Sequence, residues 1–304
     1  MSPSPHVSVV LPTYNRGALL REAVDSVVAQ TWTDWELLIA DDGSTDGSLE
    51  YPRSLGDRRI RILSLSHSGN PATARNAAIA AATGEWIAFV DSDDRWLPRK
   101  LEVQLAAVQA SAGAVWSCTG FGHIDAEGNP THQRAGIAYQ PRSGWILAQL
   151  IDGEAVAAIA TLLVRRSVLH AVGGFDEGVP FREDYDLALR LAERGEILAV
   201  GEPLSLVREH PRRATKTEPL AELFERTATI YKNAEARVSD PALRMVCRRR
   251  RADYLVDAAR ARSKSGEHGQ AFFAIMAAAR CAPTSLAVWR VTGGSVLRAL
   301  RSMI

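Results

Sequence analysis

The chain has 304 residues, of which 46% are hydrophobic and 23% are charged, a composition typical of a soluble globular protein with one large domain, or one domain and an appendage. Its three cysteines, Cys118, Cys247 and Cys281, have no spacing that indicates a disulfide framework or a zinc site. A membrane span is excluded because no run of about 18 apolar residues occurs. The first residues do not resemble a signal peptide, so we expect a cytoplasmic protein.

The formal net charge of +1 hides an uneven distribution along the chain. Residues 1–210 contain 18 Lys+Arg and 27 Asp+Glu, whereas residues 211–304 contain 18 Lys+Arg and only 8 Asp+Glu. An acidic first part and a basic last part indicate different roles for the two.

Strand-like and helix-like patterns alternate along the first two thirds of the chain. β-Branched and apolar runs that end in turn residues indicate strands, which we expect at 7–11, 35–40, 60–65, 86–90, 114–119, 160–164, 197–200 and 204–207. Apolar residues at helical spacing indicate helices, which we expect at 19–28, 48–54, 72–82, 98–110, 145–151, 183–194 and throughout from residue 219. The alternation predicts an α/β fold with a mainly parallel, doubly wound sheet and a helical C-terminal extension.

The most informative stretch is the apolar run 86–90, which leads directly into Asp91, Ser92, Asp93 and Asp94. The carboxylates follow a buried strand, and open α/β sheets bind their ligands at the carboxyl ends of strands. Carboxylate oxygens suit a hard divalent cation such as Mg²⁺ or Mn²⁺, which in turn can carry a diphosphate. The alternative is a polar turn that caps the next helix.

Two common nucleotide-binding classes are excluded by the turns of this sheet. The turn after the first strand lacks G-x-G-x-x-G, the fingerprint of dinucleotide-binding proteins. No G-x-x-x-x-G-K-[ST] occurs anywhere in the sequence, which excludes a P-loop protein.

Seven short motifs occur in a fixed order between residues 6 and 211. They are VVLPTYNR (9–16), DDGSTD (41–46), ARN (74–76), DSDD (91–94), GGFDE (173–177), ED (183–184) and REH (208–210). With these motifs the sequence resembles the family 2 glycosyltransferases, which have the A-type glycosyltransferase fold. The resemblance implies a nucleotide-sugar-binding catalytic domain at 1–211. The charge and the helical pattern of the remaining residues predict a basic, all-helical extension at 212–304.

The resemblance also implies a reaction. Such enzymes move a sugar from a nucleotide diphosphate donor to an acceptor hydroxyl, with inversion at the anomeric carbon. UDP- or dTDP-type donors are favoured, and polysaccharide or glycolipid assembly is the expected setting, with a saccharide or lipid-linked acceptor. The alternatives are a sugar-phosphate nucleotidyltransferase, which needs a Gly-rich first loop that is absent here, and a non-catalytic nucleotide-sugar-binding or scaffolding protein.

For the nucleotide, the resemblance points to a set of residues at the ends of the first strands. Tyr14 can lie against a base, although a packed loop aromatic is the alternative. Arg75 can donate to a base carbonyl or a phosphate, although it can also be a solvated helix residue. Of Asp41 and Asp42, one is expected to make turn hydrogen bonds instead. The expected nucleotide-binding residues are Pro12, Thr13, Tyr14, Asp41, Arg75 and Asp91.

For the diphosphate, the resemblance implies that Asp93 and Asp91 hold Mn²⁺ or Mg²⁺, with phosphate oxygens and waters as further ligands. His210 is the other expected ligand, against the alternative of an ordinary surface or core histidine. For the proton, Asp184 matches the general base and Glu183 its catalytic partner. The alternative is that both merely cap the helix that they begin.

The basic tail allows two interpretations. Its last segment, 286–304, combines apolar residues with arginines and can lie on an anionic membrane surface, or can pack on its neighbours. Segment 252–283 resembles a helical hairpin of the tetratricopeptide type, which needs a neighbour to cover it. Peripheral contact with the inner face of the membrane therefore stays open, whereas nucleic-acid binding is not expected because no recognised module is present.

Overall fold

The computed structural model describes residues 6–111, 113–131, 141–209 and 218–283. By its contacts the chain divides into two compact units, one of residues 1–146 and 155–211 and the other of residues 147–154 and 212–304. The sequence-based boundary after residue 211 lies at this division. Segment 147–154, which the sequence assigned to the first domain, belongs to the second unit, because Tyr231 and Arg250 donate hydrogen bonds of 3.0 and 2.9 Å to its backbone carbonyls.

Among the described residues, eight strands form one sheet in the order β3-β2-β1-β4-β7-β6-β8-β5. Their bounds are β1 Val7–Thr13, β2 Trp35–Asp41, β3 Ile60–Ser64, β4 Trp86–Phe89, β5 Arg95–Trp96, β6 Trp116–Ile124, β7 Leu163–Arg165 and β8 Ile197–Arg208. Strands β3, β2, β1 and β4 are parallel, as are β6 and β8, whereas β7 is antiparallel to both its neighbours and β5 to β8. The sheet is therefore mixed, and the expected parallel arrangement holds mainly in its N-terminal half.

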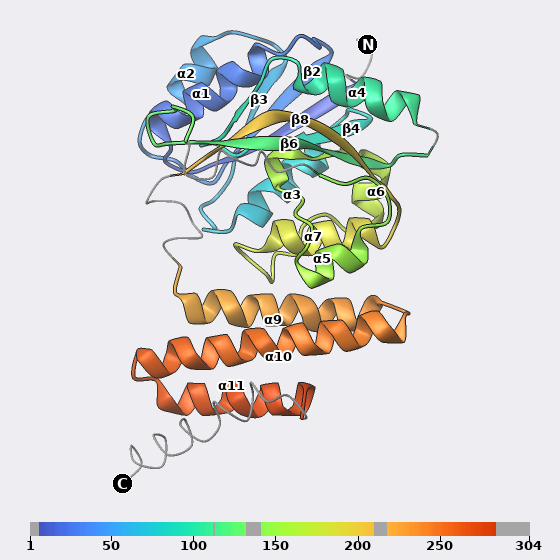
Figure 1. Ribbon diagram of the computed structural model, residues 1–304. Helices are drawn as coiled ribbons and strands as arrows, with labels where there is room; N and C mark the ends of the chain where they lie inside the picture. Colours follow the sequence, from blue (N-terminus) through green and yellow to red (C-terminus); the bar gives the residue numbers. More distant parts are fainter. Residues whose placement is uncertain (1–5, 112, 132–140, 210–217, 284–304) are drawn as a thin grey trace. The chain divides into compact units, whose positions relative to one another are not determined.

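Helices cover both faces of the parallel half, which explains why its strands are continuous apolar runs. Their bounds are α1 Gly17–Val28, α2 Glu50–Ser54, α3 Pro71–Ala81, α4 Lys100–Ala110, α6 Arg166–Ala171 and α7 Glu183–Ala192. Figure 1 shows α1, α2 and α4 on one side of the sheet and α3, α6 and α7 on the other. Because side chains alternate along a strand, every second residue of β1, β2 and β4 packs against α1 and α4 in one apolar core.

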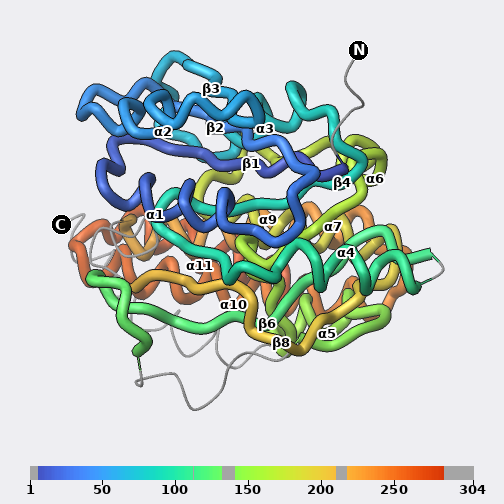
Figure 2. The backbone as a smooth tube through the Cα atoms, turned by 90° about the horizontal axis from the view of Figure 1, so that it is seen from above, coloured from blue at the N-terminus to red at the C-terminus, as the bar shows by residue number. Residues whose placement is uncertain are grey.

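The two short strands expected at 197–200 and 204–207 form one long strand. Strand β8 runs from Ile197 to Arg208 beside β6, and the two lie together although they are far apart in the sequence (Figure 2). Their register shifts on either side of Gly120, opposite the exposed residues Gly201 and Glu202 of β8. This irregularity breaks the apolar pattern in the sequence, so the strand was predicted as two pieces.

The described part of the second unit is helical, as expected. It contains α5 Leu147–Asp152, α9 Leu220–Arg237, α10 Pro241–Lys264 and α11 His268–Cys281, with α10 packed against both α9 and α11. None of the described helices is long and apolar enough to cross a bilayer.

Part of the positive charge of this helical unit is paired with carboxylates within it. Arg262 pairs with Glu225 at 2.8 Å and also with Glu267, and Arg248 pairs with Glu235 at 2.5 Å. The segment 286–304, for which membrane contact is one of the two interpretations, lies outside the described residues.

Candidate active site

The carboxyl ends of β1, β2 and β4 meet at one edge of the sheet, because these strands are parallel neighbours. The chain passes from β1 outward to β2 and β3 and then returns past β1 to β4. Such a reversal of strand order leaves a crevice at the carboxyl ends, which is where ligands of α/β sheets bind. The acidic turn 91–94 follows β4 at this point.

Three carboxylates of this turn converge. One oxygen from each of Asp91, Asp93 and Asp94 lies within 4.8 Å of the others, and the Asp94 amide donates to the Asp91 carbonyl at 3.0 Å. Hard oxygen donors at this spacing fit Mg²⁺ or Mn²⁺. Arg16 approaches from the loop after β1, with Nη2 3.9 Å from Asp93 Oδ2. The other expected metal ligand, His210, lies outside the described residues.

A buried arginine holds the turn in place. The Arg208 amide donates to Asp94 Oδ1 at 2.9 Å, and its Nε donates to the Asp93 carbonyl at 2.9 Å. Its Nη1 and Nη2 donate to the Ala126 carbonyl at 2.9 Å and to Glu22 Oε2 at 2.5 Å. Arg208 was noted in the sequence only as part of a motif, and its role in fixing the acidic turn was missed.

A second buried arginine, Arg75 of α3, lies between the acidic turn and α7. Its Nη2 donates to Asp91 Oδ1 at 2.6 Å, its Nη1 donates to Glu183 Oε1, and its guanidinium carbon lies 5.3 Å from the centre of the Phe175 ring. Burial lowers the pKa of Arg75, but the charges of Asp91 and Glu183 outweigh burial and raise that pKa, so the group stays a cation. The expected nucleotide-binding arginine thus points at two carboxylates of its own chain.

The expected catalytic pair begins α7, and its two side chains differ. Glu183 is buried, and burial raises its pKa, an effect that Arg75 opposes and the charge of Asp184 reinforces. Asp184 is half-buried and accepts a hydrogen bond of 2.7 Å from the Tyr185 amide. Because the N-cap of α7 is Arg182 and Glu183 contacts Arg75, capping does not account for Glu183, whereas the bond from Asp184 to the Tyr185 amide is of the capping type.

The loop before α7 is fastened to α3. Asn76 accepts from the Phe175 amide at 2.9 Å and donates to the Phe175 carbonyl at 3.0 Å and to Glu177 Oε1 at 2.9 Å. Thr73 donates to the other oxygen of Glu177 at 2.8 Å. A Cβ on Gly174, whose φ is +68°, would lie 2.7 Å from Asn76 Oδ1, so both the backbone angle and the close approach require glycine.

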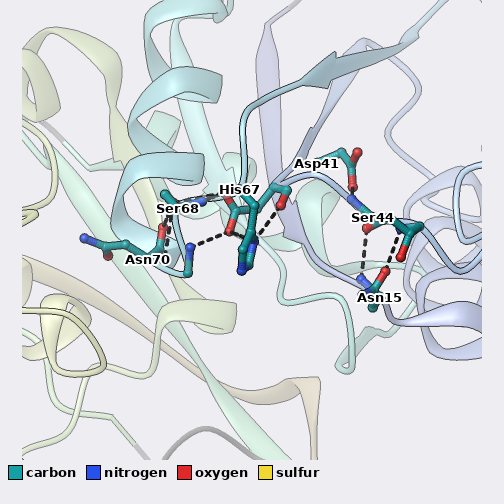
Figure 3. A network of polar contacts seen from close by, with 9 residues as sticks. Asn15, Asp41, Ser44, His67, Ser68 and Asn70 are labelled. Carbon is teal, nitrogen blue, oxygen red and sulfur yellow. Dashed lines mark hydrogen bonds and ion pairs between the residues drawn. The ribbon is translucent and has the colours of Figure 1, made fainter.

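The loops after β1 and β2 are joined by a polar network, shown in Figure 3. Asp41 Oδ1 accepts from the Ser44 amide at 3.1 Å. The Asn15 amide donates to Ser44 Oγ at 2.9 Å, and Asn15 Oδ1 accepts from the Thr45 amide at 2.8 Å. The expected nucleotide-binding loop 12–14 therefore lies beside Asp41.

Asp42 organises the loop that follows β3. It accepts from the Ser68 amide at 2.8 Å, from Ser68 Oγ at 2.9 Å and from the Gly69 amide at 2.9 Å, and lies 3.0 Å from His67 Nδ1. The Tyr14 ring, 41% exposed, is stacked on His67 with 4.1 Å between the ring centres. His67 was not singled out in the sequence, since an isolated loop histidine gives no pattern.

A family model described as "Glycosyl transferase family 2" matches residues 8–172, more than half of the chain. The chain belongs to this family. The motifs that carried the resemblance thus identified the family correctly, and the strand ends described above lie within the matched segment.

Curated relatives of this family 2 member are bacterial glycosyltransferases. The Escherichia coli UDP-Glc:alpha-D-GlcNAc-diphosphoundecaprenol beta-1,3-glucosyltransferase WfgD is 40% identical over 100 residues, 33% of this chain and 40% of the relative. The putative teichuronic acid biosynthesis glycosyltransferase TuaG of Bacillus subtilis is 38% identical over 128 residues, 41% of this chain and 50% of the relative. The chain spans half or less of the length of these two relatives.

Solved structures share the fold of this family 2 member. Staphylococcus aureus TarS 1–349, in complex with UDP-GlcNAc, has a TM-score of 0.69 at 18% identity and covers 90% of this chain and 81% of its own. The mannosyltransferase PcManGT of Pyrobaculum calidifontis, in complex with GDP-Man and Mn²⁺, has a TM-score of 0.59 at 20% identity, with 97% and 81% covered. These likenesses confirm the predicted A-type glycosyltransferase fold.

Proposed function

We propose that the protein is a metal-dependent, inverting glycosyltransferase that moves a sugar from a nucleotide diphosphate to an acceptor hydroxyl. The observation that carries the proposal is the link between the acidic turn and the Glu183–Asp184 pair. Arg75 touches both Asp91 and Glu183, so the groups proposed for the leaving diphosphate and for the proton belong to one continuous site.

The donor is a UDP- or dTDP-type sugar, held by Pro12, Thr13, Tyr14, Asp41 and Asp91. The exposed ring of Tyr14 offers a face for a base, and the buried carboxylate of Asp41 can accept from a base N–H or a ribose hydroxyl. The name of the E. coli relative includes UDP-Glc, and the S. aureus structure contains UDP-GlcNAc, which supports a uracil nucleotide.

A divalent cation, Mn²⁺ or Mg²⁺, is held by Asp93 and Asp91, with Asp94 beside them and His210 as a further ligand. When bound, it neutralises negative charge on the departing diphosphate. Arg208 already binds the Asp93 carbonyl and the Asp94 carboxylate, so the acidic turn is arranged before the cation binds.

Asp184 is the general base that takes the proton of the acceptor hydroxyl while the oxygen attacks the anomeric carbon. A single displacement of this kind inverts the configuration. Asp184 lies in the first turn of α7 and its side chain is half-buried. Glu183, which lies in the same turn and is buried against Arg75, is the catalytic partner of Asp184.

The acceptor is a saccharide or lipid-linked saccharide of a surface polysaccharide or glycolipid. The name of the E. coli relative includes GlcNAc-diphosphoundecaprenol, and that of the B. subtilis relative includes teichuronic acid biosynthesis; both support this class. Peripheral membrane contact through the C-terminal extension accords with such an acceptor.

The test is the release of UDP or dTDP from a panel of UDP- and dTDP-hexoses by the purified full chain, with Mn²⁺ or with EDTA. We expect turnover that requires the metal and falls about 10²- to 10⁴-fold in Asp184→Asn, because a general base contributes that much. Binding of UDP should persist in this variant. Glu196→Gln, an exposed carboxylate beyond the end of α7, is the matched control and should keep wild-type turnover. Turnover that is indifferent to both the metal and Asp184 would refute the proposal.

A further inference from the structure

One buried cation connects two ends of the site that are distant in sequence. The side chain of Arg75 is 6% exposed, and its partners Asp91 and Glu183 lie 16 and 108 residues further along the chain. Asp91 is more accessible than Glu183, with side-chain exposures of 27% and 6%. The guanidinium is therefore enclosed on the side of Glu183, whereas on its other side it contacts Asp91, the more exposed first residue of the acidic turn.

The geometry of this contact is specific to arginine. A guanidinium is planar and rigid, so its two end nitrogens fix the direction of two carboxylates at once, which a single ammonium does not do. Burying a charge is expensive unless it is paired, and removing one partner of a buried pair leaves the other charge uncompensated. Without Arg75, the carboxylates of Asp91 and Glu183 would lose their shared counter-charge.

We propose that Arg75 is a positioning residue that fixes Asp184 relative to the donor site by holding Glu183 and Asp91 together. The inference rests on the function proposed above and differs from the sequence-based expectation that Arg75 binds the nucleotide. Arg75 acts through the two carboxylates: Glu183 precedes Asp184 in the first turn of α7, and Asp91 belongs to the turn that carries the other metal-binding aspartates.

A separate set of contacts keeps the loop before α7 attached to α3 when Arg75 is replaced. Asn76, the next residue of α3, holds Phe175 and Glu177 through hydrogen bonds of 2.9 to 3.0 Å that do not involve Arg75. The loop before α7 therefore remains attached to α3 in an Arg75 variant. The predicted change is a shift of the Glu183 side chain and of Asp184, the proposed general base, which follows it in α7.

The experiment compares Arg75→Met and Arg75→Lys with wild type for UDP affinity by calorimetry with Mn²⁺, and for kcat and KM of UDP release. We expect Arg75→Met to lower kcat about 10²-fold, the cost of misplacing a catalytic group by roughly 1 Å. UDP affinity should change only several-fold. Arg75→Lys should recover part of kcat, because an ammonium can serve one carboxylate at a time.

Two further variants separate positioning from loss of stability. Glu183→Gln combined with Arg75→Met should reduce kcat by less than the product of the single effects, since both act through one contact. Arg61→Met is the matched control: Arg61 pairs with Glu36 at 3.1 Å near the start of β2, at the other end of the strand from Asp41. It should leave kcat unchanged.

The outcomes distinguish the two proposals. If UDP affinity falls in Arg75→Met as far as kcat/KM does while kcat is retained, Arg75 is a direct donor ligand and the inference is wrong. The inference alone also fails if wild type is active and Arg75→Met keeps its kcat. If wild type releases neither UDP nor dTDP from any donor in the panel, the proposed function itself fails.

Discussion

At the residue scale, Lys100 is an amine in the core for which the described residues supply no counter-charge. It begins α4, is fully buried, and its Nζ lies 4.1 Å from the centre of the Trp96 ring. The described residues offer this Nζ no hydrogen-bond partner, and burial lowers the pKa of Lys100 from 10.5 to about 7. Burial also raises the pKa of the nearby Cys118 thiol to about 12, so the thiol stays neutral and supplies no negative charge.

The shifted pKa of Lys100 predicts a pH-dependent stability. The folded pKa lies below the unfolded one, so between about pH 7 and 10.5 the unfolded chain binds more protons and stability rises with pH. Below pH 7 the penalty is complete and constant. Lys100→Met should therefore be more stable than wild type at pH 7, and should lose a slope of up to about 1.4 kcal/mol per pH unit. Urea unfolding between pH 6 and 10 measures this, with the exposed Lys232→Met as control. Equal slopes in wild type and Lys100→Met would contradict it.

The sequence predicted the candidate site residues but not their contacts in the fold. The order of motifs identified the family and brought Asp91, Asp93 and Asp184 forward as candidates, whose roles remain predictions. That Arg75 is buried between two carboxylates depends on the tertiary fold, which brings α3 near the start of α7, and helical spacing alone does not contain that information. Asp42 likewise looked equivalent to Asp41 in the sequence, and only the loop after β3 distinguishes them.

At the scale of elements, α3 is the helix that joins the two halves of the site. It contacts β1 and β2 on one side. On the other side, Arg75 reaches Glu183, and Asn76 holds the loop before α7. The close approach of Gly174 to this helix leaves no room for a side chain.

Gly174→Ala tests this junction. The new methyl group meets Asn76 Oδ1 and the backbone φ of +68° is unfavourable for alanine, so we expect a destabilisation of about 1–3 kcal/mol. Asn76→Ala alone loses hydrogen bonds to Phe175 and should cost a similar amount. Because the clash disappears when Asn76 is shortened, the double variant should be more stable than the sum of the two effects predicts. Denaturant unfolding of the four proteins gives the coupling, and strict additivity would refute the contact.

Among the elements, long apolar runs were predicted well and short or irregular ones were not. Strands β1, β2 and β4 and helices α1, α3 and α4 lie within a few residues of their expected positions. The two-residue strand β5 and the short helix α6 were missed because neither is long enough to establish a period. The antiparallel direction of β7 is also invisible in the sequence, since a buried strand is apolar whichever way it runs.

At the scale of the whole molecule, ligand binding should appear as added stability. UDP and Mn²⁺ together are expected to raise the melting temperature of the full chain, and each alone much less, because the proposed site holds the diphosphate through the cation. At a ligand concentration 100-fold above Kd the gain is about 2.7 kcal/mol.

Differential scanning fluorimetry with UDP, GDP and dTDP, each with Mn²⁺ or EDTA, measures that gain. Asp93→Asn should lose the part that depends on Mn²⁺ and keep the fold. A shift that is equally large in EDTA would contradict the proposed metal site. A larger shift with GDP than with UDP would contradict the proposed base.

The hydrogen bonds by which Arg208 holds the acidic turn have a consequence for the order of events during protein synthesis. Its guanidinium bonds to Glu22, 186 residues earlier, and to the Asp93 carbonyl, 115 residues earlier. On the ribosome, the first four strands and their helices leave the exit tunnel long before this arginine does. We therefore expect the acidic turn of the nascent chain to become ordered only late, when β8 is synthesised and Arg208 can bond to Asp93 and Asp94.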